Sequence, residues 1–177
     1  MNKALAAILL FASCGARAAE LVRYAPASNA FSCDIPADWT AFEENEPAGT
    51  AVHIFGPESA SGAYRAGLDI RYAERGQPGF RSFKKIIEDL RRQGGGREAT
   101  AVRAFKIPSS LARVFEVSES LRLPPGASPS LEETVHDYIA VVPAGESYYV
   151  IRLSSTREVY LDYKDFFFNF LKTFRPT

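Results

Sequence analysis

The sequence predicts an α+β protein in which helices cover a largely antiparallel sheet. Two observations favour this class. Several segments alternate apolar and polar residues with the period of two that a strand shows when one of its faces is packed. Two other segments repeat apolar residues at helical spacing. The links between the strand segments are short and rich in turn residues, which indicates antiparallel neighbours and a single domain.

The first 18 residues have the layout of an export signal. Lys3 supplies a positive start, residues 4–12 form an apolar core of about 9 residues, and Ala16 and Ala18 provide the small residues that signal peptidase accepts. This core is much shorter than the roughly 20 residues of a membrane-spanning helix. We therefore predict a signal peptide at 1–18 and a mature domain at 19–177. The mature chain is expected to have no transmembrane segment and to be periplasmic or secreted.

An alternative interpretation places the cleavage before Cys14. Residues 11–13 approximate the sequence that precedes the cysteine of a lipoprotein signal, so Cys14 would carry a lipid anchor. Under either interpretation Cys33 has no partner for an internal disulfide. We expect Cys33 to be a small buried hydrophobic residue, with a reactive or intermolecularly bonded thiol as the alternative.

The balance of charge excludes two classes of partner. The chain has 21 basic and 21 acidic residues, and removal of residues 1–18 leaves 19 basic residues against 21 acidic ones. Nucleic acid and anionic lipid both recruit strongly basic surfaces, so neither is expected to bind. Lys84, Lys85, Arg91 and Arg92 form the main basic group, and helical spacing explains them as a solvated face.

The first predicted helix lies within residues 80–96. Phe83, Ile86, Ile87 and Leu90 fall on one apolar stripe. The glycines at 94–96 follow this stripe, and we expect them to end the helix in a left-handed cap.

The second predicted helix lies near the C-terminus. Ser155 and Glu158 have the spacing of a capping box. Five aromatic side chains then share one face, at positions Tyr163, Phe166, Phe167, Phe170 and Phe174. Burial of five such rings contributes on the order of 10 kcal/mol before conformational entropy is counted, so we expect this helix to be part of the core.

The strand predictions rest on alternation and on β-branched and aromatic residues. The predicted strands are FSCDI (31–35), TAVHIF (50–55), GLDIRYAE (67–74), ATAVRAFKI (99–107), LARVFEVSESL (111–121), ETVHDYIAVV (133–142) and SYYVIRLSS (147–155). A proline-rich segment at 122–132 is expected to be a surface loop.

The two histidines are the first candidates for a functional site. His53 and His136 each lie inside a predicted strand, and Asp137 follows His136. Consecutive residues of a strand point to opposite faces, so His136 and Asp137 are not expected to share a ligand. A metal site needs about three or four converging ligands, and the sequence leaves open whether the two histidines converge.

Other catalytic patterns are weak. The chain contains no G-x-S-x-G motif and no phosphate-binding glycine loop. The acidic runs at 43–46 and 132–133 are expected in a turn and beside a loop, where solvated carboxylates keep ordinary pKa values. We therefore predict that the protein is not an enzyme, and we assign no catalytic, cofactor-binding or metal-binding residue.

Three segments together resemble PsbP-like proteins. These are FSCDIPADWTAFEE (31–44), the helix within GFRSFKKIIEDL (79–90), and the closing unit ESYYVIRLSS to FRP (146–176). The resemblance implies an α/β/α sandwich around an antiparallel sheet, and proteins that are mostly not enzymes but bind other proteins. The basic N-terminal arm of the photosynthetic members has no counterpart in residues 19–28, so we expect no photosystem role.

Three hypotheses on function follow. The first is an exported, non-enzymatic accessory protein that binds or helps to assemble a partner protein in the cell envelope. The second is a small-ligand or metal-binding module that uses His53 and His136. The third, with the least support, is a hydrolase built from scattered carboxylates.

Overall fold

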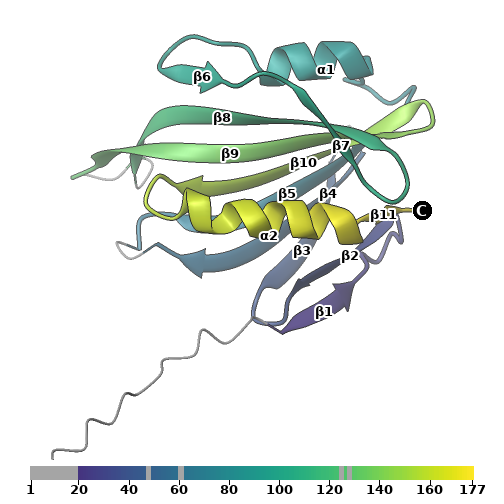
Figure 1. Ribbon diagram of the computed structural model, residues 1–177, viewed down its shortest axis with the longest axis horizontal. Coiled ribbons are helices and arrows are strands. Elements are labelled where there is room, and N and C mark those ends of the chain that lie inside the picture. Colours follow the sequence, from purple (N-terminus) through teal and green to yellow (C-terminus); the bar gives the residue numbers. More distant parts are fainter. Residues whose placement is uncertain (1–19, 47–48, 60–61, 124–125, 127–128) are drawn as a thin grey trace, which may run out of the picture.

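The computed structural model describes residues 20–46, 49–59, 62–123, 126 and 129–177 (Figure 1). The predicted signal peptide and Cys14 lie outside these residues. The elements of the described chain are, in order, β1 Leu21–Tyr24, β2 Phe31–Pro36, β3 Thr40–Glu46, β4 Gly49–Glu58, β5 Arg65–Ala73, α1 Phe83–Leu90, β6 Arg97–Ala99, β7 Arg103–Lys106, β8 Leu111–Leu123, β9 Leu131–Ala144, β10 Ser147–Thr156, α2 Tyr160–Thr173 and β11 Arg175–Pro176.

The strands form two sheets. The large sheet has the strand order β3-β4-β5-β10-β9-β8-β6, and β7 pairs with β8 next to β6. A small sheet has the order β1-β2-β11. The paired strands run antiparallel throughout the described chain, which confirms the predicted antiparallel sheet.

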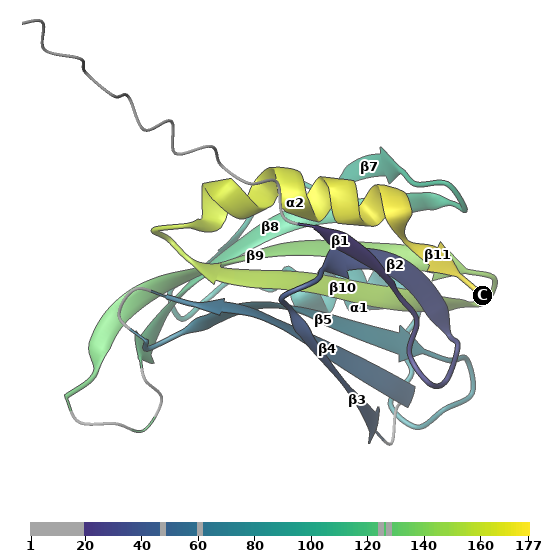
Figure 2. The same cartoon turned by 90° about the horizontal axis from the view of Figure 1, so that it is seen from below.

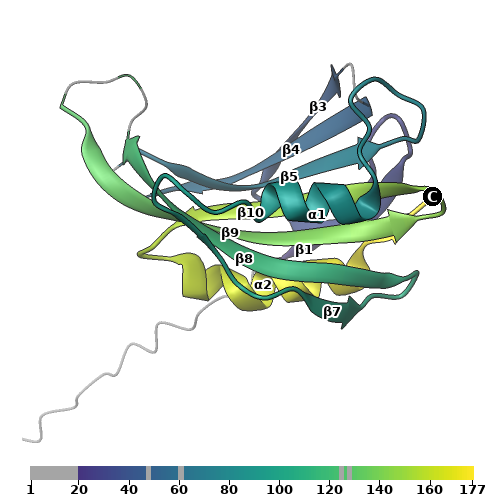
Figure 3. The same ribbon diagram turned by 90° about the horizontal axis from the view of Figure 1, so that it is seen from above.

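The two helices lie on opposite faces of the large sheet. Helix α2 and the small sheet cover one face (Figure 2). Helix α1 lies on the other face, over β9 and β10, while β3 and β4 extend away from it (Figure 3). The expected α/β/α layering is therefore only partial, because a short helix covers one part of its face and sheet dominates the structure.

The larger core lies between the sheet and α2. Phe167, Phe170, Leu171 and Phe174 are buried there, whereas Tyr163 and Phe166 of the predicted aromatic face are only partly buried. The rings contact side chains of both sheets; Phe174, for example, lies 5.1 Å from Phe31 between ring centroids. The aromatic tail is therefore part of the core, as expected.

The second core lies beneath α1. Side chains of β8, β9 and β10 form it, and the predicted stripe of α1 packs against them. The central strand β10 is consequently buried on both faces: Tyr149 and Ile151 face α2, whereas Tyr148 and Val150 face α1.

The predicted start of the second helix and the predicted end of the first helix both differ from the structure. Ser155 belongs to β10, and Val159 is the residue before α2 without a side-chain cap, so the predicted capping box is wrong. The strand continues because residues up to Thr156 pair with β9. Helix α1 ends at Leu90, and Arg91 caps it with a φ of −94°. The glycines at 94–96 instead adopt positive φ angles in the turn that leads into β6.

The predicted strands also need three corrections. The acidic run at 43–46 lies in strand β3 and not in a turn. The segment predicted as one strand over 99–107 is divided into β6 and β7, which pair with different parts of β8. Strands β1 and β11 were not predicted, because each has too few residues to show a clear period of two.

Cys33 is fully buried in β2, as expected for a small hydrophobic residue. Burial raises the pKa of its thiol to about 12, which leaves almost no thiolate at neutral pH. Because the thiolate is the reactive form, Cys33 is chemically inert in the folded protein.

Candidate functional site

The two histidines lie on opposite faces of the large sheet. His53 of β4 is paired with Asp69 of β5, which is paired with Arg152 of β10, so the three side chains share the α1 face. His136 belongs to the α2 face, where its ring stacks on Tyr160 with 4.0 Å between centroids. The histidines therefore do not converge, and a ligand or metal site that uses both of them is not formed.

His53 is held by acidic residues of both neighbouring strands. Its Nδ1 lies 3.0 Å from Asp69 Oδ2, and its Nε2 lies 3.8 Å from Glu44 Oε2. Asp69 also accepts a hydrogen bond of 2.8 Å from Arg71 Nε. These residues form a charged row on the open part of the α1 face. Within the described part of the chain, no group of three or more His, Cys, Asp and Glu side chains is placed to hold a metal ion.

Two aromatic side chains lie beside this charged row. Phe42 of β3 is directly opposite His53 in the strand register, and its exposed fraction is 56%. Phe55 of β4 is 43% exposed, and its ring stacks with His53. We call this surface, formed by Phe42, Glu44, His53, Phe55 and Asp69, the open half of the sheet.

His136 lines a small depression of about 200 Å³ on the α2 face together with Glu98, Glu116 and Tyr160. Burial, and next the positive charge of Arg157, lower the pKa of His136 below its usual value. The imidazole is therefore neutral at pH 7, and its stacking on Tyr160 joins β9 to the first turn of α2.

The most buried carboxylate on the α1 face is Asp137 of β9, next to Arg152 and Ser154 of β10. Ser154 Oγ donates a hydrogen bond to Asp137 Oδ1, and Arg152 Nε lies 3.7 Å from Asp137 Oδ2. Burial raises the pKa of Asp137 above its ordinary value, although Arg152 and the Ser154 hydrogen bond oppose this shift. The carboxylate is thus paired with a cation and a hydroxyl group.

This raised pKa predicts a pH dependence of stability. The folded state holds the proton of Asp137 more tightly than the unfolded chain, whose Asp pKa is about 3.9. The stabilising contribution of Asp137 to the free energy of unfolding is therefore fully present below pH 3.9. It is lost as the pH rises through the higher pKa of Asp137 in the folded state. The free energy of unfolding of wild type minus that of Asp137→Asn should fall as the pH rises from about 4. Urea unfolding of both proteins between pH 3 and pH 7 measures this difference, and a rise with pH would contradict the assignment.

The acidic runs noted in the sequence do not form a second site. Glu132 is exposed and Glu133 half-buried at the start of β9, whereas Glu43 of β3 accepts backbone hydrogen bonds from Ala27 and Ser28. Sequence reasoning selected His53 but missed its neighbours Asp69 and Arg152 on the adjacent strands. The signal for these two residues was that each occupies a polar position of an alternating strand.

Comparison with known proteins supports the fold. No protein-family model matches the chain, and no curated protein matches it significantly. Among solved structures, it is similar to the solution structure of cyanobacterial PsbP (CyanoP) from Synechocystis sp. PCC 6803. The likeness has a TM-score of 0.54 at 16% sequence identity, and it covers 94% of this chain and 99% of the other. The chain therefore has a PsbP-like fold, as the sequence resemblance implied.

Neither helix of the described chain is both long and apolar enough to cross a membrane.

Proposed function

We propose that the protein is an exported, non-enzymatic accessory protein that binds, or helps to assemble, another protein of the cell envelope. Export depends on the predicted signal peptide at 1–18, with a lipid anchor on Cys14 as the alternative. The open half of the sheet is the docking surface. Its partner presents an apolar side chain to the two phenylalanines and polar groups to the charged row.

The observation that carries this proposal is the exposure of Phe42 and Phe55. Helix α1 covers the β8-β9-β10 part of its face and leaves these two rings in solvent. Aromatic side chains dominate the energetics of many protein interfaces, where they lie inside a polar rim. The His53–Asp69 pair and Glu44 supply such a polar surrounding, and β3 ends the large sheet on this side.

The PsbP-like fold is consistent with this proposal but is not its evidence, because a shared fold does not transfer function. The two alternatives have less support from the geometry. The histidines occupy opposite faces of the sheet, which disfavours a common ligand site. The most buried acid of the α1 face, Asp137, is paired with Arg152 and Ser154, which disfavours a hydrolase that needs two acids in one cleft.

Site-specific photo-crosslinking tests the docking surface. A photoreactive phenylalanine analogue replaces Phe42 in the full chain, which is irradiated in intact cells of its source. We expect one discrete adduct with an envelope protein, and a matched loss of this adduct when Phe55→Ser is added. The control places the same analogue at Leu161 of α2, which is 63% exposed on the opposite face. Adducts of equal yield from both positions, or none from Phe42, would overturn the proposal.

A further inference from the structure

Four arginines from four different segments line an open depression of about 310 Å³ beside α1. Arg81 precedes α1, Arg92 follows it, Arg97 lies in β6, and Arg152 lies in β10. Asp89 and Leu90 of α1 complete the wall. We call this depression the arginine pocket.

One acidic residue, Asp89, holds two of these guanidinium groups in place. Asp89 lies 2.5 Å from Arg81 and 2.8 Å from Arg92, and it also contacts Lys85 at 3.2 Å. The backbone N–H of Arg81 donates a hydrogen bond to the hydroxyl oxygen of Tyr148. The segment that carries Arg81 is therefore anchored at both its backbone and its side chain.

Strand pairing positions the other two arginines. Arg97 Nη2 donates a hydrogen bond of 2.8 Å to the carbonyl oxygen of Leu90, at the C-terminal end of α1. Arg97 is also opposite Glu119 of β8 in the strand register. Arg152 Nε is 3.7 Å from Asp137, which is within ion-pair distance but too far for a hydrogen bond.

Positive charge remains in excess at this place. The four arginines and Lys85 face three acids, which are Asp89, Asp137 and Glu119. Asp69 lies opposite Arg152 as well, but its charge is balanced by Arg71, with which it forms an ion pair. The formal charge of the whole chain is zero. A local excess of two positive charges therefore makes the arginine pocket a favourable position for an anion.

Two arginines of the arginine pocket each have a buried Nε donor without a partner in the described part of the chain. The Nε atoms of Arg97 and Arg152 are buried and have no hydrogen-bond partner among the described residues. Buried polar groups in folded proteins are almost always hydrogen-bonded, to protein, water or ligand. Guanidinium groups match the paired oxygens of carboxylate and phosphate groups, which accept two parallel hydrogen bonds.

We propose that the arginine pocket binds a small oxyanion, a polycarboxylate or a phosphate. The depression of about 310 Å³ is large enough for a ligand of that size. The side chain of Arg152 is 38% exposed, less than those of Arg81 and Arg92 at 55% and 71%. The arginine pocket adjoins the proposed docking surface, because Arg152 is opposite Asp69 in the strand register, but the two sites share no residue. Binding of an oxyanion is therefore tested independently of the proposed function.

Calorimetric titration of the purified protein with citrate and with inorganic phosphate tests this site and separates the two sources of oxyanion. At low ionic strength, we expect saturable binding of at least one of them, weakened by added salt. Arg152→Gln should reduce the affinity at least tenfold. Arg81→Gln, whose side chain is 55% exposed, should also reduce it and leaves the sheet unperturbed.

Arg122→Gln is the matched control, because this exposed arginine of β8 lies outside the arginine pocket and should leave the affinity unchanged. Circular dichroism of each variant verifies that it is folded. Absence of binding by both probes would overturn the proposal. Equal affinities of wild type, Arg152→Gln and Arg81→Gln would also overturn it, because they would show nonspecific ion association only.

Discussion

Phe174→Ala is expected to lower the free energy of unfolding by about 3–5 kcal/mol, the usual cost of removing a fully buried phenylalanine ring. Phe174 is 0% exposed. Its ring contacts Phe31 of β2 and Tyr149 of β10, with centroid distances of 5.1 and 5.3 Å. The side chain therefore joins the C-terminal tail to both sheets, and its loss leaves a cavity that neighbouring rings cannot fill without moving.

Urea unfolding measures this effect as a lower transition midpoint. Leu161→Ala is the control, because Leu161 lies in the same helix but is 63% exposed, and such a change should alter stability by no more than about 0.5 kcal/mol. A domain of this kind is stable by about 5–15 kcal/mol, so Phe174→Ala removes a large part of its stability. A loss below about 1 kcal/mol would show that the tail does not dock as described.

The parts of the fold that depend on local periodicity could be predicted from the sequence. The stripe of α1 and the aromatic face of α2 need only the spacing of residues along one helix, and both pack as that spacing indicates. Strand β2 likewise buries Phe31, Cys33 and Ile35. In each of these elements, one face is apolar enough to be recognised without knowledge of its neighbours.

The parts that depend on pairing could not be predicted. Strand β3 has an acidic end that resembles a turn, and it is held as a strand by its register with β4. The end of β10 has the spacing of a capping box, but pairing with β9 extends the strand through it. The arginine pocket needs residues 81, 92, 97 and 152 together. The register of β6, β8, β9 and β10 places Arg97 and Arg152, whereas Asp89 of the packed helix α1 holds Arg81 and Arg92.

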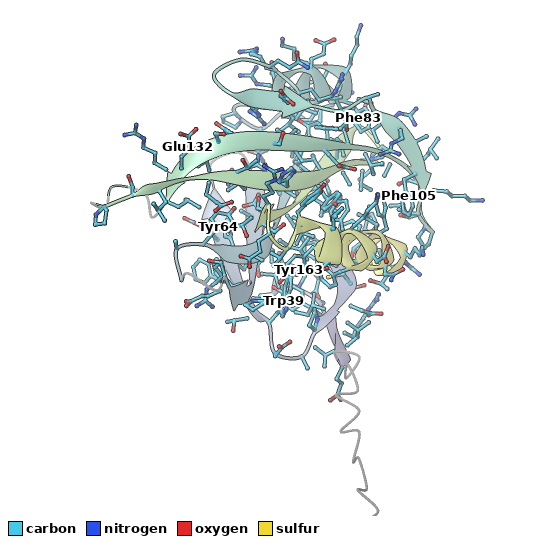
Figure 4. All side chains as sticks on the ribbon, turned by 60° about the vertical axis from the view of Figure 1, so that its left-hand side comes forward. Trp39, Tyr64, Phe83, Phe105, Glu132 and Tyr163 are labelled. Atoms are coloured by element: carbon cyan, nitrogen blue, oxygen red, sulfur yellow. The ribbon has the colours of Figure 1, made fainter. Side chains whose placement is uncertain are left out.

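Gly56→Ala is expected to destabilise the protein by about 1–3 kcal/mol, the typical cost of overpacking. A Cβ atom at Gly56 would lie 2.7 Å from the indole ring of Trp39, closer than any normal contact. Trp39 cannot move freely, because its ring packs against Phe166 and Tyr163 of α2 at centroid distances of 4.9 and 6.1 Å. Figure 4 shows Trp39 and Tyr163 together beside α2, on the far side of the sheet from Phe83.

A double-mutant cycle identifies the cause of this destabilisation. In a Trp39→Ala background there is no indole ring to displace, so the cost of Gly56→Ala should fall by most of its value. Gly67→Ala is the matched control, because a Cβ atom there would lie 2.8 Å from the backbone oxygen of Ile54. That clash involves strand β4 itself, so its cost should be the same with Trp39 or Ala at position 39.

Equilibrium unfolding of the single and double variants supplies all four free energies of each cycle. An unchanged cost of Gly56→Ala in the Trp39→Ala background would show that the close approach of indole ring and glycine is not what fixes this position. The expected coupling between Gly56→Ala and Trp39→Ala would instead explain why a tryptophan occupies position 39, shortly after strand β2. The ring fills the space that a glycine in the irregular end of β4 leaves open beneath α2.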